Sequence, residues 1–163
     1  MKNSIIIALI FCFSSCINQK TDPSTAATID SLRAEIKEIK EKFKPGLGEI
    51  MGGIQMHHAK LWFAGINGNW KLSAYEIAEI KERLIQAMEI ETERPEVKNI
   101  PIMFPSIDSI STAINNRDDE GFKKQFNMLT NACNSCHFSL KFEFNKVTIP
   151  GSVPVSNQEF KIR

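Results

Sequence analysis

The stretch Cys133-Asn134-Ser135-Cys136-His137 decides how the rest of this chain is interpreted. Its pattern, C-x-x-C-H, is the one at which proteins attach a c-type haem covalently. Two intervening residues keep both thiols within one helical turn, where each sulfur can add to one vinyl group of the porphyrin. The imidazole of the next residue then lies beneath the iron as its proximal ligand. The motif predicts one covalent haem c, attached through Cys133 and Cys136 and ligated by His137.

Other kinds of site also use closely spaced cysteines. A thioredoxin-like redox motif requires a preceding strand in a βαβ setting, which this sequence does not predict. A zinc site requires further ligands at close spacing, and the remaining histidines, His57 and His58, lie far upstream. Incidental thiols beside a histidine are the last alternative to haem attachment.

The N-terminus has the pattern of an export signal. Lys2 precedes a short apolar run over residues 5–13, too short to span a bilayer as a mature helix. Ser14-Ser15-Cys16 follows and resembles a bacterial lipobox, although Phe13 stands where Leu is usual. We therefore expect residues 1–15 to be a signal peptide and Cys16 to be lipidated, which anchors the protein on the periplasmic side of a bacterial membrane. The alternative is an ordinary signal peptide with Cys16 incidental.

The four cysteines of the chain are then all assigned. Cys12 leaves with the signal, Cys16 carries lipid, and the motif uses the other two, so no disulfide is expected. The formal net charge of +1 falls to about zero without Lys2, and no basic stripe is visible. Composition therefore gives no argument for a nucleic-acid partner.

Residues 16–28 are polar and predict a tether, and residues 29–44 predict an amphipathic helix. Apolar residues in the second segment recur at alternating spacings of three and four, which is an a/d stripe of about two heptads. The stripe either packs on its own domain, which we expect, or pairs with a second copy in a homodimer. Its members are Ile29, Leu32, Ile36, Ile39 and Phe43.

Residues 45–145 predict a single helical bundle, and residues 146–163, with two prolines and a glycine, an extended tail. Apolar periodicity predicts helices over 47–66, 71–91, 106–116 and 119–142. Residues 92–105 contain three prolines and are expected to be an extended connection. The fold class is therefore all-α: a four-helix bundle with an extra N-terminal helix and an extended C-terminal tail.

The position of C-x-x-C-H in the last helix resembles the cytochrome c′ / cytochrome c-556 class of four-helix bundles. Cytochromes of the mitochondrial type carry the motif near the start instead. The resemblance covers roughly residues 47–142, and its one specific motif is the pentapeptide. The family often has a basic residue shortly after the histidine, and Lys141 stands at such a position.

The resemblance implies that the helix over 47–66 supplies the opposite haem face. Met51 and His58 lie on one face of it, about 10 Å apart along the axis, so both cannot reach the iron. Met51 lies near the start of this helix, where we expect the haem, and is our candidate sixth ligand. His58 is the second candidate, and core packing is the alternative for both. His57 points about 100° away and is expected to be a surface or packing residue.

These features predict a monohaem c-type cytochrome that transfers electrons to or from an unidentified redox partner protein. The alternative, also implied by the resemblance, is a protein that binds or senses nitric oxide or carbon monoxide at an open sixth position. Enzymatic peroxidase chemistry is disfavoured, because no distal acid–base pair accompanies the single motif. Whether a side chain fills the sixth position discriminates the first two functions.

Overall fold

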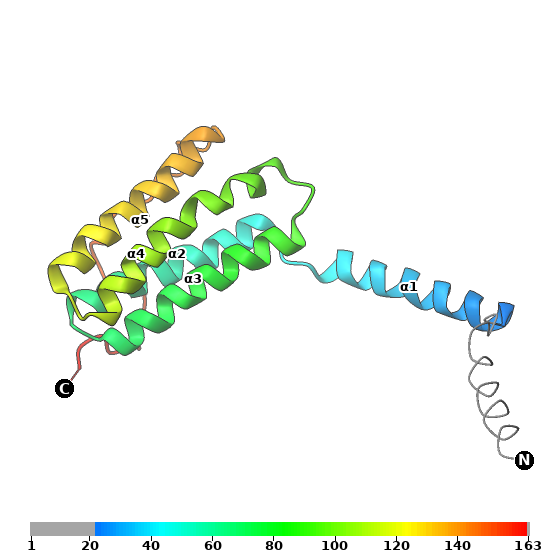
Figure 1. Cartoon of the computed structure of the whole chain (residues 1–163), viewed down its shortest axis with the longest axis horizontal. Coiled ribbons are helices and arrows are strands. Elements are labelled where there is room, and N and C mark those ends of the chain that lie inside the picture. Colours follow the sequence, from blue (N-terminus) through cyan, green and yellow to red (C-terminus); the bar gives the residue numbers. More distant parts are fainter. Residues whose placement is uncertain (1–21, 163) are drawn as a thin grey trace, which may run out of the picture. The chain divides into compact units, whose positions relative to one another are not determined.

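The computed structural model describes residues 22–162, and these residues form helices without any strand. The described residues divide into two compact units, with the boundary between Lys44 and Pro45. The first contains α1 and the second the other helices, which Figure 1 labels. Their bounds are α1 Pro23–Phe43, α2 Leu47–Ile66, α3 Trp70–Ile90, the 3₁₀ segment η2 Pro95–Met103, α4 Phe104–Asn115 and α5 Asp119–Ser139. The all-α prediction is confirmed.

Helix α1 begins at Pro23, so residues 23–28 are helical and the prediction of a tether there was wrong. Asp22 caps the helix by accepting a hydrogen bond from the Ser24 backbone N–H, and Pro23 occupies the first turn, where its missing N–H costs nothing. The polar composition suggested a linker, but the Asp-Pro pair is a helix start signal. The helix ends at Phe43, before Pro45.

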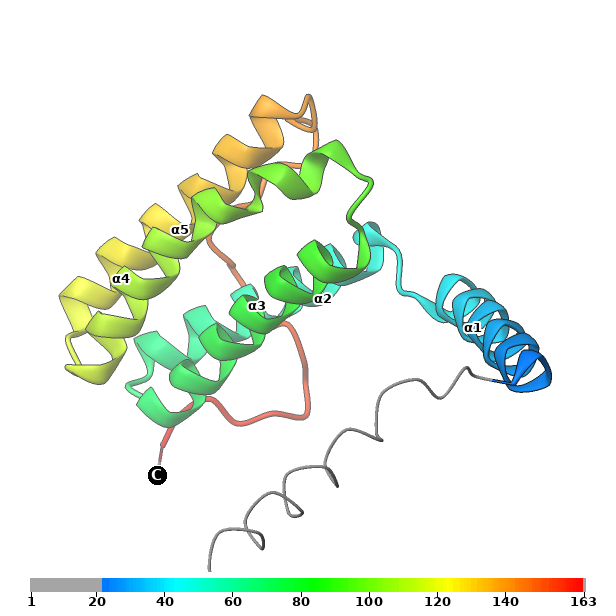
Figure 2. The same ribbon diagram turned by 45° about the vertical axis from the view of Figure 1, so that its right-hand side comes forward.

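Helices α2, α3, α4 and α5 run alternately up and down, as Figures 1 and 2 both show. Each packs on the next along the chain, and α5 also packs on α2. One continuous hydrophobic core lies between them. Its large members on these four helices are Leu47, Ile50, Ile54, Leu61, Ile77, Ile80, Leu84, Ile107, Ile110, Ile114, Phe122, Phe126 and Leu129.

Three of the bundle helices end in the same way. At each end, a backbone N–H bonds back to the carbonyl five residues earlier, in the hydrogen-bond pattern of a Schellman cap. The bonds are Asn69 N to Ala64 O, Asp118 N to Ala113 O and Phe142 N to His137 O. The residue before each donor has a positive φ: Gly68 (68°), Arg117 (53°) and Lys141 (62°). Two helix ends therefore use a side-chain-bearing residue in a conformation that favours glycine.

The segment expected to be an extended connection is instead the 3₁₀ segment η2, which contacts α3, α4 and α5. Val97, Ile100 and Met103 are buried in the common core. These three residues are spaced three apart, which matches the 3₁₀ repeat and places them on one side of the helix. Their burial explains why a proline-containing stretch forms a 3₁₀ helix here. Pro95 stands in the first turn of η2 and Pro105 in the first turn of α4, where no N–H donor is needed, whereas Pro101 lies inside η2.

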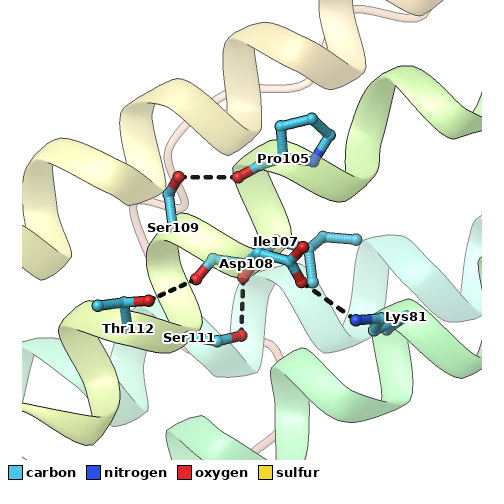
Figure 3. Close-up of polar contacts among 7 residues, drawn as sticks. All are labelled: Lys81, Pro105, Ile107, Asp108, Ser109, Ser111 and Thr112. Atoms are coloured by element: carbon cyan, nitrogen blue, oxygen red, sulfur yellow. Dashed lines mark hydrogen bonds and ion pairs between the residues drawn. The ribbon is translucent and has the colours of Figure 1, made fainter.

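Helices α3 and α4 are also joined by a polar contact at the bundle surface. Lys81 Nζ lies 3.1 Å from Asp108 Oδ1, and Figure 3 draws this ion pair. The nearby hydroxyls of Ser109, Ser111 and Thr112 bond to carbonyls of their own helix, at 2.7–2.9 Å. These hydroxyls are satisfied within α4 and do not need a partner from α3.

The C-terminal segment has neither helix nor strand, as expected, but it is fixed to the bundle at two places. Near its start, Val147 pairs with Asn134 of α5 through two hydrogen bonds. Near its end, Phe160 is buried with its ring 5.8 Å from that of Phe63 in α2. Figure 2 shows the segment returning along the bundle between these points.

Candidate haem-attachment site

The pentapeptide lies in the last two turns of α5, which ends at Ser139. Both of its thiols are free. Cys133 packs against the hydrophobic core, and this burial raises the pKa of its thiol to about 12. Burial also raises the pKa of Cys136, which is less covered. At neutral pH both cysteines are therefore neutral thiols on one side of the helix.

His137 is held in one tautomer by the C-terminal segment. Its Nδ1 lies 2.7 Å from the backbone oxygen of Asn145. A carbonyl oxygen only accepts hydrogen bonds, so Nδ1 carries a proton, and in the neutral imidazole Nε2 therefore carries the lone pair. Nε2 has no partner among the described residues. A histidine that donates its other N–H to a carbonyl is typical of a metal ligand with a fixed ring orientation.

Asn134, the first residue between the two cysteines, reinforces this arrangement. Its amide nitrogen donates to the Val147 carbonyl at 2.9 Å, and its amide oxygen accepts from the Val147 N–H at 2.8 Å. The returning chain is therefore fixed to α5 at the residue that directly follows Cys133 and lies two before Cys136, and Val147 is itself two residues after Asn145. No sequence signal indicated these partners, because backbone groups are the same at every position.

A hollow of about 530 Å³ lies beside this turn, within the 300–1,000 Å³ range of ligand pockets. It is lined by Asn131, Asn134, Ser135, His137, Phe138, Glu143 and Lys146. His137 lines it, whereas neither cysteine does. Phe138 and the nearby Phe144 are 72% and 80% exposed, which is unusual for such large apolar side chains.

The residues fit a covalent haem in their donor chemistry. Two free thiols stand one turn apart, an imidazole offers an unpaired Nε2, and exposed phenylalanines provide apolar surface for a flat macrocycle. Protein side chains alone do not form a metal site here: within residues 22–162, no three His, Cys, Asp or Glu side chains gather closely enough to hold an ion.

His58, the second candidate for the sixth ligand, is buried between α2 and α5. Its Nε2 lies 2.9 Å from Thr130 Oγ1, and its ring centroid lies 4.5 Å from that of Phe126, with the two planes tilted by 35°. The Thr130 hydroxyl donates its own proton to the Phe126 carbonyl, so it must accept from His58 Nε2–H. Burial lowers the pKa of His58 from 6.5 to about 4. His58 is thus a neutral packing residue whose Nε2 lone pair is unavailable.

Met51 is partly buried and packs against the core on α2. The His58–Thr130 bond fixes the antiparallel register of α2 and α5, since these helices run in opposite directions (Figure 1). The residue seven before His58 on α2 is Met51, and it therefore lies level with the residue seven after Thr130 on α5, which is His137. This places Met51 at the axial level of His137, as required of a residue that covers the other haem face.

His57 makes a contact that its sequence position did not indicate. Its Nδ1 donates to Glu76 Oε2 of α3 at 2.6 Å, and Glu76 is 1% exposed. Glu79 Oε2 lies 3.7 Å from the other ring nitrogen. His57 therefore supports a buried carboxylate between α2 and α3, which is a packing role and not a haem contact.

Cys16 and the expected signal peptide lie outside the described residues. Within residues 22–162, no helix is both long enough and apolar enough to cross a membrane.

Comparisons of the chain with protein-family models, with curated proteins and with solved structures find no match.

Proposed function

We propose that this protein is an exported monohaem c-type cytochrome that transfers electrons. Cys133 and Cys136 hold the haem through thioethers, and His137 Nε2 is the proximal iron ligand. A bound haem would supply an iron that cycles between the ferrous and ferric states, at a potential tuned by its ligands and burial. The motif, the bundle and the site together resemble the cytochrome c′ class, which remains part of the proposal.

One observation carries this proposal. In the neutral imidazole, the hydrogen bond from His137 Nδ1 to the Asn145 carbonyl leaves the lone pair on Nε2, which has no partner among the described residues and stands next to two free thiols. A histidine that ligates a metal needs its tautomer and ring orientation fixed by such a bond to its other ring nitrogen. The exposed Phe138 and Phe144 support the same conclusion, because a porphyrin would cover apolar surface that water now meets.

Attachment needs no oxidant. Each thiol adds across one vinyl double bond: a sulfur–carbon bond forms, and the thiol proton ends on the neighbouring vinyl carbon. Because Cys133 is packed against the core and its thiol is protonated at neutral pH, we expect attachment before α5 closes onto the bundle.

The test is covalent haem on the exported full-length chain. The protein is produced in a bacterial host that matures c-type cytochromes, separated on a denaturing gel and stained for haem. We expect a stained band that disappears in the Cys133→Ala/Cys136→Ala double variant. Ser135→Ala is the matched control, since it changes the motif without removing a thioether. An unstained parent chain, or staining that survives the double variant, contradicts the proposal.

Met51 is the proposed sixth ligand, because His58 Nε2 is engaged by Thr130. Met51→Ala should convert a low-spin ferric spectrum into a high-spin one and abolish the weak far-red band of methionine–iron ligation. Met56→Ala on the same helix, 40% exposed, should leave the spectrum unchanged. A high-spin parent that binds carbon monoxide without displacing a ligand would instead support the gas-binding alternative.

Anchoring through Cys16 is the remaining part of the proposal. The Cys16→Ser variant should move the protein from the membrane fraction to the soluble periplasmic fraction, as judged by fractionation of export-competent cells. Continued membrane association of this variant would refute lipidation at Cys16.

A further inference from the structure

Helix α1 exposes a continuous apolar stripe. None of its residues is buried. The exposed fraction rises from 38% at Ile29 to 73% at Phe43, with Leu32, Ile36 and Ile39 at 52–56%. An amphipathic helix is normally stabilised by covering such a face, so the stripe needs an occupant.

The stripe has the register of a two-stranded coiled coil. Ile29, Ile36 and Phe43 occupy a positions, and Leu32 and Ile39 occupy d positions. β-Branched residues at a with leucine at d favour parallel dimers. Two residues depart from this preference: Ile39 at the second d position and Phe43 at the last a position. A globular domain or a lipid surface would accept a wider and less regular apolar face.

The charges beside the stripe favour a second copy of the same helix. Glu35 is at a g position and Lys40 is at the following e position, so a parallel pair brings each Glu35 opposite the other copy's Lys40. Neither side chain has an ion-pair partner among the described residues. An antiparallel pair with the same apolar layers would instead bring each Glu35 toward its own counterpart.

We propose that α1 is a dimerisation helix, which pairs with α1 of a second copy as a parallel two-stranded coiled coil. A helix of 21 residues makes a weak pair on its own. Association is therefore expected where the local concentration of the protein is high. The inference does not depend on haem binding, since α1 belongs to a separate compact unit.

Cysteine cross-linking in the full-length chain tests this directly. In a parallel coiled coil, the two copies of an a position lie close enough for a disulfide, which requires Cα atoms within about 7 Å. Under mild oxidation, Ile36→Cys should give at least about tenfold more cross-linked dimer than Ala34→Cys, which lies on the outer face. Equal cross-linking at both positions, or none at position 36, overturns the proposal; a domain or lipid surface covering the stripe gives the second result.

Charge exchange then tests the pairing of Glu35 with Lys40. In the Ile36→Cys background, Glu35→Lys or Lys40→Glu alone sets like charges opposite each other twice and should reduce cross-linking about tenfold. Mixing the two variants, distinguished by tags of different size, restores both attractions and should restore the cross-link as a heterodimer. A mixture that cross-links no better than either variant alone would exclude this register.

Discussion

The ionisation of His58 provides the sharpest test of the bundle interior. Burial lowers its pKa from 6.5 to about 4. Above pH 6.5 the imidazole is neutral in both the folded and the unfolded chain, and its titration does not affect stability. Between pH 6.5 and 4 His58 binds a proton in the unfolded chain but stays neutral in the folded chain. The free energy of unfolding therefore decreases as the pH falls.

The size of the effect follows from the two pKa values. One pKa unit corresponds to about 1.4 kcal/mol, so His58 should cost about 2 kcal/mol of stability at pH 5 and about 3 kcal/mol below pH 4. The assay is urea unfolding at several pH values between 7.5 and 4.5, for the parent and for His58→Gln, which has no proton to gain.

The difference between these two proteins isolates His58 from the carboxylates, which both share. We expect the free energy of unfolding to fall more steeply with acidification in the parent, by about 2 kcal/mol between pH 7.5 and 5. An imidazole NMR titration checks the same point without a substitution. Identical pH dependence in the two proteins, or a His58 signal that titrates near pH 6.5, would refute the buried, neutral imidazole.

Two backbone positions give further predictions. A β-carbon at Gly65 would lie 2.0 Å from the Phe122 ring, so Gly65→Ala should destabilise the bundle by about 1–3 kcal/mol in urea unfolding. Gly48→Ala, also in α2 but with open space around it, should instead stabilise by about 0.5–1 kcal/mol, and equal effects would contradict the close packing of α2 on α5. Lys141 has a φ of 62°, so Lys141→Gly should raise the free energy of unfolding by a few tenths to 1 kcal/mol. A decrease would mean that the lysine side chain itself stabilises the helix end.

Periodicity predicted the bundle helices well because each has one strongly apolar face. The start of α2 was predicted at its observed residue, and that of α3 within one residue. The predictions were wrong where composition competed with a local signal. Polar residues concealed the Asp22-Pro23 start of α1, and prolines concealed the 3₁₀ turns of η2.

The candidate site shows a different limit. The cysteines and His137 are adjacent in sequence, so their spacing alone indicated their chemistry. The partners of His58 and His57 are separated from them by 72 and 19 residues, and the His137 bond uses a backbone carbonyl. Such pairs depend on how neighbouring helices are aligned and on the path of the C-terminal segment. A single sequence encodes neither in a local pattern.

The clamp between Asn134 and Val147 assigns a role to residues that lie outside the helices. If His137 binds iron, the Asn145 carbonyl that polarises its Nδ1–H sets how strongly the imidazole donates electrons, and thereby the reduction potential. That carbonyl is positioned by Val147, two residues on, through its paired hydrogen bonds to Asn134. Substitutions in this loop would then change the reduction potential of the haem, while the bundle core and the attachment motif stay unchanged.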